Sequence, residues 1–288
     1  MTLSKLLYNL VPKKVFLQIR QKFYVYRKKM HKPLTVDQMK YVLINKLHVE
    51  SGNMVFVHSS MDFLNIDFPT HKLLNLLLEL VGDEGTLIFP AWHFNYRAED
   101  YLNSDKVFDL QRSPSAMGLL SEFARRNKMA FRSIHPTTSI VAIGKHAREL
   151  TEDHQNSIYP CGEKSPYYKM MKYDAKIIGL GVTAHFVSFL HCPEDVLNTQ
   201  FPFKTRTEKV FVGKVKLPDG ECIEVKTLAA SSNIGNRDIP GFFKKYVSTG
   251  MMNSFKFKGN SFYVAFSKPL FDRVVELAKS GITIYNVN

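Results

Sequence analysis

The hydrophobic positions of this 288-residue chain follow two different spacings. Apolar residues at every third or fourth position predict amphipathic helices, and short continuous apolar runs predict buried strands. In the first two thirds of the chain the two kinds of segment alternate, with strands expected at 54–57, 86–89, 140–143 and 175–180. Buried strands separated by helices are typical of a largely parallel sheet covered on both faces, so we expect an α/β fold with three layers, α/β/α.

The last third of the chain has the pattern of antiparallel hairpins. Polar and apolar residues alternate along 209–216 and 222–227, on either side of a Pro-Asp-Gly turn. Residues 255–266 indicate a second hairpin, and residues 269–278 have the spacing of a terminal helix. The sequence shows no internal repeat, so residues 35–288 are expected to form one domain with antiparallel C-terminal hairpins.

The first 34 residues are expected to form a distinct basic arm. Their apolar residues have helical spacing, and residues 1–32 hold nine of the chain's thirteen excess positive charges, because no acid precedes Asp37. Such a segment either packs on its own domain or on a second subunit, as in a homodimer, or lies on an anionic membrane surface. No nucleic-acid-binding motif accompanies the charge, so nucleic acid is not an expected partner.

The composition is that of an ordinary globular chain. Hydrophobic residues make up 45% and charged residues 23% of it, and the sequence has neither an apolar run of membrane-spanning length nor a recognisable signal peptide. The three cysteines, at 161, 192 and 222, are too few for a disulfide framework and lack zinc-ligand spacing, so we expect no metal. A cytoplasmic location is expected, and the arm would allow contact with the inner membrane surface.

Candidate catalytic residues lie in the stretch 180–195. A strand is expected to end there in a glycine turn and to continue as a helix. On that helix four polar side chains recur every three residues, so neighbours in the series share a face: His185, Ser188, His191 and Glu194. His191 with Glu194 is the smallest unit that can move a proton, since histidine titrates near neutral pH and a carboxylate fixes its tautomer.

Two further segments have the features of anion sites. The first is His58-Ser59-Ser60, directly after the first strand. The second includes Ser115, Met117 and Gly118 and opens a helix expected at 116–126, with Ser113 or Ser115 as its cap. Free backbone amides and small hydroxyl side chains at such turns bind phosphate, although they also serve simply to cap a helix.

Two loop residues are candidates for lining a cleft. Trp92, the only tryptophan, lies in a long polar loop after the second strand, and His135 is extended because it precedes a proline. Each of them could equally anchor its own loop.

Taken in order, these segments resemble the aminoglycoside 3-N-acetyltransferase family, an acetyltransferase fold distinct from that of the GNAT enzymes. The resemblance covers roughly residues 35–280. No single motif is specific, whereas the order and spacing of the motifs together are. The matching segments are 57–61, 85–90, 108–118, 132–144, 162–166, 180–182 and 188–194.

The resemblance implies an α/β/α fold that binds acetyl-CoA, or another acyl-CoA, as its cosubstrate. The acyl group would pass directly to an amine. The CoA would lie near both anion sites, at His58, Ser59, Ser60, Ser115, Met117 and Gly118.

The resemblance also implies the catalytic roles. His191 would be the general base, assisted by Glu194, and the Ser188 hydroxyl would stabilise the tetrahedral intermediate. Pro193, between the pair, is a departure from the family pattern. A proline removes a backbone donor and can break the helix at this point. His185 is a second departure, and it would face the substrate together with Trp92 and His135.

The charge balance narrows the expected acceptor. An aminoglycoside is a polycation, which a cleft lined by carboxylates would bind, yet residues 33–288 carry 30 basic and 26 acidic side chains. The expected function is therefore transfer of an acyl group, most simply acetyl, to an amino sugar, free, nucleotide-linked or lipid-linked, in surface-polysaccharide biosynthesis. An aminoglycoside 3-N-acetyltransferase that confers antibiotic resistance is the alternative, and a non-catalytic binding protein on the same fold is the second alternative.

Overall fold

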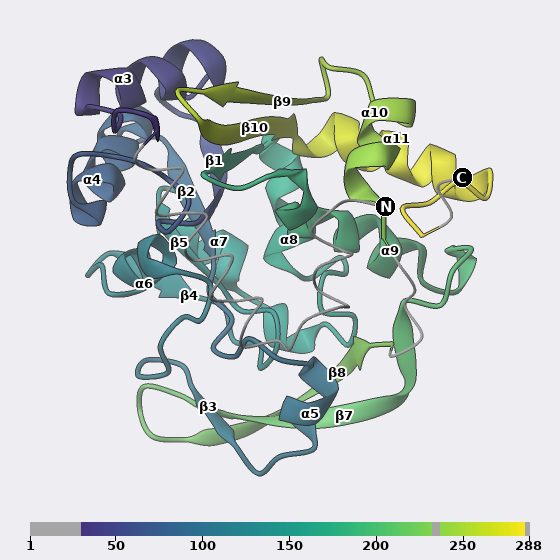
Figure 1. The fold of residues 1–288 in the computed structure, drawn as a ribbon. Helices are drawn as coiled ribbons and strands as arrows, with labels where there is room; N and C mark the ends of the chain where they lie inside the picture. The colour runs from purple at the N-terminus through teal and green to yellow at the C-terminus, as the bar shows by residue number, and fades with distance from the viewer. Residues whose placement is uncertain (1–29, 232–236, 286–288) are drawn as a thin grey trace.

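The sheet at the centre of the fold has seven strands in the order β4-β5-β2-β1-β6-β10-β9 (Figure 1). This computed structural model describes residues 30–231 and 237–285. Strand β1 (Met54–Ser59) runs parallel to β2 (Thr86–Pro90) on one side and to β6 (Lys176–Leu180) on the other. The outer pairings are antiparallel and involve β4 (Ala130–Arg132), β5 (Ile140–Gly144), β9 (Met252–Phe257) and β10 (Asn260–Phe266).

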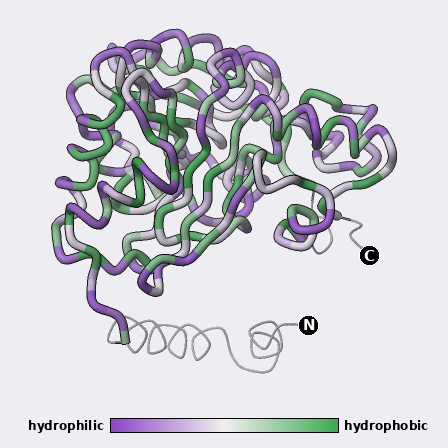
Figure 2. Tube along the Cα trace, turned by 90° about the horizontal axis from the view of Figure 1, so that it is seen from above, coloured by the Kyte–Doolittle hydropathy of each residue, from purple (hydrophilic) through white to green (hydrophobic). Residues whose placement is uncertain are grey.

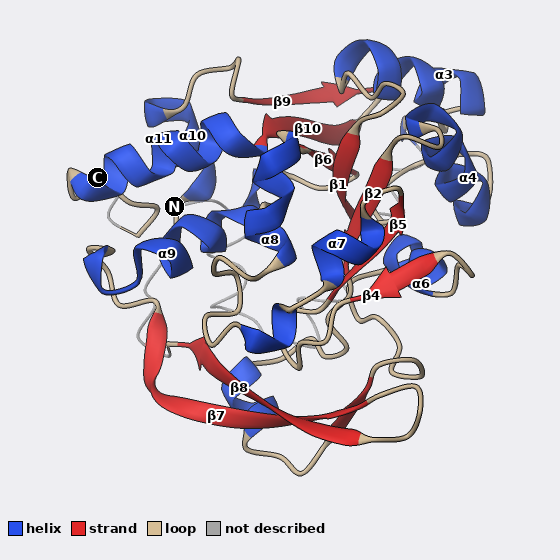
Figure 3. Cartoon of the chain, turned by 180° about the vertical axis from the view of Figure 1, so that it is seen from behind, coloured by secondary structure: helices blue, strands red, loops and turns tan. Residues whose placement is uncertain are grey.

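Alternate residues of the central strands face opposite layers of helices, as the two-residue period of a strand requires. Val55 and Val57 pack with α3 (Val36–Tyr41), α4 (Thr70–Val81) and α6 (Leu119–Arg125). Met54 and Phe56 pack on the other side with α7 (Ala147–Thr151), α8 (Pro166–Lys169), α10 (Ile239–Tyr246) and α11 (Ser267–Lys279). Figure 3 shows these layers on either side of the sheet, and the expected three-layer α/β/α fold is confirmed.

Both expected hairpins are present, but they join different sheets. Strands β7 (Arg206–Lys216) and β8 (Cys222–Ala230) pair with each other and with β3 (Val107–Asp109) in a separate three-stranded sheet. This small sheet lies at the opposite end of the molecule from β9 (Figure 3). The second hairpin, β9–β10, extends the main sheet because β10 pairs with β6.

Helix α6 begins later than predicted. Gly118 has a φ of 104° and ends the preceding loop, so the helix starts at Leu119 and not at residue 116. The serines do not cap it, because the Ser113 hydroxyl accepts from the Asp109 amide at 3.0 Å and the Ser115 hydroxyl accepts from the Met117 amide at 3.2 Å. The expected serine cap is therefore wrong, and these hydroxyl groups stabilise the loop.

The carboxyl ends of the parallel strands β1, β2 and β6 meet at one edge of the sheet, where ligands bind in open α/β folds. Gly181, just past β6, has a φ of 72°, and a Cβ atom there would lie 2.8 Å from the Ser60 carbonyl oxygen. Only glycine allows the loops after β1 and β6 to approach this closely. These loops supply most of the candidate site.

The hydrophobic positions gather inside the body and the hydrophilic ones on its outer loops (Figure 2). In the described ranges, no helix combines the length and apolar character needed to cross a membrane. The predicted amphipathic arm falls mainly on residues 1–29, outside the described residues. Leu34, at the end of that arm, is fully buried and forms a β-bridge with Ile66.

Candidate active site

The stretch after β6 bends twice before it becomes a regular helix. Two 3-10 turns, Ala184–Phe186 and Ser188–Leu190, precede α9 (His191–Leu197). Val187, between the turns, has a ψ of 83°, which is not helical. The predicted continuous helix is therefore wrong, and His185 is exposed on a turn of its own.

His191 and Glu194 lie in the first turn of α9. The His191 Nδ1 atom is 2.8 Å from Glu194 Oε2. Pro193 is the third residue of the helix, where a backbone N–H has no intrahelical acceptor, so its ring leaves the helix intact. The break considered at Pro193 does not occur.

Glu194 is held on both carboxylate oxygens. The Tyr285 hydroxyl donates to Oε1 at 2.7 Å, and the side chain is almost completely buried. Burial works to raise the pKa of Glu194, but His191, Arg206 and the Tyr285 hydroxyl hold it below its ordinary value. The ionised carboxylate accepts from His191 Nδ1–H, so the neutral ring has its lone pair on Nε2.

Arg237 contacts the opposite side of the His191 ring. Its NH1 group lies 3.4 Å from His191 Nε2. A guanidinium group can only donate, so this contact also requires the lone pair on Nε2. His191 Nε2 is thus oriented to accept a proton.

His191 lies where two clefts meet. The first, which we call the arginine cleft, measures about 420 Å³ and is lined by Arg97, Arg206 and Arg237. The second, the histidine cleft, measures about 220 Å³, and its lining includes His58, Ser59, Met117, His185 and Ser188. Trp92, His191 and Arg237 line both clefts.

The candidate cofactor residues are close together, but only some line a cleft. His58, Ser59 and Met117 line the histidine cleft, whereas Ser60, Ser115 and Gly118 do not. A Cβ atom at Gly118 would lie 3.5 Å from the Ser59 carbonyl oxygen, so the turn after β1 and the loop before α6 are adjacent.

A buried hydrogen-bond group surrounds Ser188. The His58 Nε2 atom is 2.8 Å from the Ser188 hydroxyl, and burial lowers the pKa of His58 to about 3, so this ring is neutral at pH 7. The Trp92 indole donates to the Tyr167 hydroxyl at 3.2 Å, and Tyr167 also interacts with the Ser188 side chain by a hydrogen bond. These contacts hold the Ser188 hydroxyl on the wall of the histidine cleft.

His135, expected to face the substrate, does not line either cleft. The residue is fully buried, and its Nδ1 atom accepts from the amides of Thr137 and Thr138 at 3.3 and 3.2 Å. Its ring stacks on His154 with 4.4 Å between centroids. The imidazole therefore orders the loop that carries Thr137 and Thr138 to the arginine cleft.

The buried histidines predict that the fold is sensitive to acid. The pKa of His58 is lowered to about 3 and that of His154 to about 4, both by burial, whereas the unfolded chain takes up protons at the ordinary value of about 6.5. The contribution of each neutral histidine to stability is therefore fully present above the pKa of the unfolded chain. It is lost as the pH falls towards the pKa of the folded state. For each of these two histidines, the free energy of unfolding is expected to be about 2 kcal/mol lower at pH 5 than at pH 7.

Urea unfolding at pH 7 and pH 5 measures this loss. His154→Gln removes one titrating group and is expected to reduce the difference between the two pH values. An equal difference in the variant and the parent would contradict the assignment.

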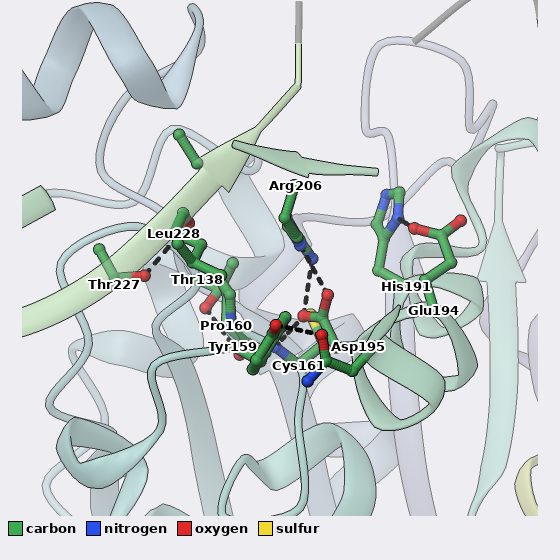
Figure 4. Close-up of polar contacts among 12 residues, drawn as sticks. Thr138, Tyr159, Pro160, Cys161, His191, Glu194, Asp195, Arg206, Thr227 and Leu228 are labelled. Carbon is green, nitrogen blue, oxygen red and sulfur yellow. Dashed lines mark hydrogen bonds and ion pairs between the residues drawn. The ribbon is translucent and has the colours of Figure 1, made fainter. Parts of the chain in front are cut away.

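A buried ion pair between Arg206 and Asp195 lies beside the His191–Glu194 pair, which we call the dyad (Figure 4). Arg206 donates to both oxygens of Asp195, at 2.6 and 2.7 Å, and the Cys161 amide donates to the same carboxylate at 2.7 Å. The pair joins the start of β7 to α9 and to the wall of the arginine cleft. Arg206 also lines a groove of about 590 Å³ with the aromatic residues Tyr159, Phe201 and Phe203, which we call the aromatic groove.

The buried cysteines stay protonated, and a protonated thiol is a poor nucleophile. Cys161 and Cys192 are buried, and burial raises the pKa of both well above the ordinary value. Within the described parts of the chain, no group of three or more His, Cys, Asp and Glu residues could hold a metal ion.

The structure adds site residues that sequence spacing did not indicate. Tyr285 lies 91 positions after Glu194, and Arg237 lies 46 positions after His191. Tyr167 and the Asp195–Arg206 pair were also missed, because only the folded chain brings them to the dyad. Asp195, next to Glu194 in sequence, was the only local signal of such a pair.

Curated relatives of this chain are aminoglycoside acetyltransferases. Aminoglycoside N(3)-acetyltransferase III of Salmonella sp is 30% identical over 166 residues, which are 53% of this chain and 58% of the relative. Aminoglycoside N(3)-acetyltransferase IX of Micromonospora chalcea is 27% identical over 186 residues, 59% of this chain and 66% of the relative. The chain thus matches less than two thirds of the length of these relatives.

Solved structures share the fold along nearly the whole chain. Aminoglycoside acetyltransferase AAC(3)-Xa has a TM-score of 0.73 at 20% identity and covers 93% of this chain and 99% of its own. AAC-IIIb, in a binary complex with CoASH, has a TM-score of 0.70 at 19% identity. The match covers 88% of this chain and 99% of AAC-IIIb. A mutant of AAC(3)-IVa in complex with a gentamicin has a TM-score of 0.70 at 21% identity and covers 89% and 92%.

The family model for aminoglycoside 3-N-acetyltransferases matches residues 56–279. This range includes β1 from Phe56 onward, the loop with Trp92, and the dyad of α9. It also covers more than half of the chain, as the resemblance of its ordered motifs predicted. The chain therefore belongs to the aminoglycoside 3-N-acetyltransferase family.

Proposed function

We propose that this protein transfers an acetyl group from acetyl-CoA to an amino group on a sugar or aminocyclitol ring. The observation that carries the proposal is the place of His191 Nε2, which is oriented by Glu194 and lies where two clefts meet. One cleft would hold the thioester and the other the amine, so both reactants would meet at the base. Direct transfer requires such a geometry.

The histidine cleft is the proposed donor side. The Ser59 hydroxyl and His58 Nδ1 are buried there without a hydrogen-bond partner among the described residues. Buried polar atoms are rarely left unpaired, so these atoms suit a ligand with amide and carbonyl groups, such as the pantetheine arm of CoA. The apolar side chains of Val182, Val187 and Leu190 would pack along that arm.

The proposed chemistry starts with deprotonation, because an alkylammonium group cannot attack a thioester. His191 Nε2 takes the proton of the acceptor, while Glu194 stabilises the resulting imidazolium through Nδ1–H. The nitrogen then bonds to the acyl carbon, and the carbon–sulfur bond breaks. The new amide nitrogen releases its second proton to solvent, and the leaving thiolate takes the proton from His191, so the base is restored.

Ser188 is the proposed donor to the developing oxyanion. Indole can only donate, so the Tyr167 hydroxyl beside Ser188 accepts from Trp92. With His58 donating through Nε2, the Ser188 oxygen is the acceptor of that bond and its own proton is left for the cleft. A hydroxyl arranged this way can stabilise negative charge on the thioester oxygen.

The comparisons support the alternative expectation, aminoglycoside acetylation, better than surface-polysaccharide biosynthesis, for which they give no support. The relatives described above are named for aminoglycosides. We therefore define the acceptor by its reacting group, an amine on a sugar or aminocyclitol ring. This class includes the aminoglycosides.

Thiol release from acetyl-CoA in the presence of an acceptor panel tests the proposal. The panel contains gentamicin, glucosamine and phosphorylated glucosamines, and mass spectrometry identifies the acetylated product. At least one acceptor is expected to gain an acetyl group in a reaction that requires His191. Acetyl-CoA binding without turnover of any acceptor would instead favour a binding protein on the same fold.

Ser188→Ala is expected to lower kcat by roughly 10²- to 10³-fold, the usual loss when one oxyanion donor is removed. The KM for acetyl-CoA is expected to change little, because the missing bond forms mainly in the transition state. Steady-state kinetics measure both constants. Ser188→Thr keeps the hydroxyl and serves as the matched control; a raised KM with unchanged kcat in Ser188→Ala would assign the serine to binding alone.

A further inference from the structure

The arginine cleft holds positive charge that the proposed chemistry does not use. Its charged lining consists of Arg97, Arg206 and Arg237 against the single carboxylate of Glu194. Arg206 is neutralised by Asp195. Both oxygens of Glu194 already accept hydrogen bonds, from His191 and Tyr285, so this carboxylate offers little to a second cation.

Two guanidinium groups therefore remain for a ligand. Arg97 pairs with Glu99 at 3.4 Å, but their side chains are 52% and 34% exposed, and solvent screens such surface pairs strongly. Arg237 is exposed, and no carboxylate of the described residues is within ion-pair distance of it. Its one polar contact in the described ranges is His191 Nε2.

The contact between Arg237 and His191 competes with catalysis. Nε2 is the atom that must accept the proton of the acceptor amine, and Arg237 donates to the same lone pair. Arg237 must therefore withdraw when an acceptor enters. An anionic group on the acceptor would attract the guanidinium group and would release Nε2 in the same binding step.

We infer that the acceptor is an amino sugar that carries an anionic group, best matched by phosphate, held between Arg97 and Arg237. The inference rests on the proposed function and specifies its acceptor. Phosphate oxygens accept two parallel bonds from a guanidinium group, whereas a polycationic acceptor would bring ammonium groups against two arginines. The arginine cleft shares Glu194, Thr205, Arg206 and Leu228 with the aromatic groove, so the two are adjacent.

Acceptors with the same amine but different charge test the inference. The set is glucosamine, glucosamine 6-phosphate, UDP-glucosamine and, as a polycation, gentamicin. One or both phosphate-bearing sugars are expected to exceed glucosamine in kcat/KM by roughly 10-fold or more, the scale of hydrogen bonds to charged groups. Comparison of the two phosphorylated sugars distinguishes a monoester from a nucleotide-linked diphosphate.

Arginine variants test whether the preference for a phosphorylated acceptor arises in the arginine cleft. Arg237→Gln and Arg97→Gln are each expected to lower the ratio of kcat/KM for the phosphorylated over the unphosphorylated sugar by roughly 10-fold. Arg148, an exposed arginine that lines neither cleft, is the matched control, and Arg148→Gln is expected to leave the ratio unchanged.

Three results would count against the inference. Glucosamine or gentamicin as the best acceptor would overturn it and leave the proposed function intact. The parent ratio persisting in both Arg237→Gln and Arg97→Gln would show that the phosphate binds elsewhere. Absence of His191-dependent thiol release with every acceptor would instead reject the proposed function itself.

Discussion

His191→Ala is expected to lower kcat/KM by roughly 10²- to 10⁴-fold at neutral pH, the range for loss of a general base. The folded state is expected to persist, because the His191 side chain is 23% exposed and its polar partners are Glu194 and Arg237. The deficit is expected to shrink as the pH rises above the pKa of the acceptor amine, since water then removes the proton. Initial rates of thiol release between pH 6 and pH 10 measure both effects.

His71→Ala is the matched control, because this exposed histidine lies on α4, away from both clefts. Activity within 10-fold of the parent in His191→Ala would exclude His191 as the base. A deficit that persists at alkaline pH would assign His191 to positioning of the substrates.

Asp195→Ala is expected to destabilise the fold by about 3–5 kcal/mol, the cost of leaving a buried charge without its partner. The variant leaves the buried Arg206 guanidinium unpaired and the Cys161 amide without its acceptor. Urea unfolding monitored by circular dichroism measures the loss. The double variant Asp195→Ala/Arg206→Met removes both charges and is expected to recover part of the lost free energy.

The exposed pair Lys268–Asp272 provides the comparison. Its side chains are 54% and 56% exposed, so Asp272→Ala is expected to cost less than about 1 kcal/mol. A cost for Asp195→Ala no larger than that of Asp272→Ala would mean that the buried pair adds nothing to stability.

The central strands could be predicted because their residues are buried on both faces. Phe56 and Val57 face different helix layers, and so β1 is apolar at every position from Met54 to Val57. The direction of the neighbouring strands could not be predicted in the same way. A hydrophobic pattern reports burial but not pairing, and it does not reveal that β5 and β10 run antiparallel to the strands beside them.

The dyad could be predicted because His191 and Glu194 lie within one helical turn. The same spacing misled the interpretation of His185 and Ser188, since steps of three residues also fit separate 3-10 turns. Arg237 and Tyr285 could not be predicted, because their contacts with the dyad depend on tertiary packing. His135 illustrates the same limit: its place before a proline indicates an extended backbone but not the side to which the imidazole turns.

The bond between Tyr285 and Glu194 has a consequence for synthesis of the chain. Tyr285 leaves the ribosome 91 residues after Glu194, which at roughly 5–20 residues per second is a delay of about 5–18 s. Strand β10, which pairs with β6 beside the site, also emerges late. A nascent chain can therefore fold its parallel strands early, but its proton-transfer pair becomes rigid only after the last helix and Tyr285 have been made.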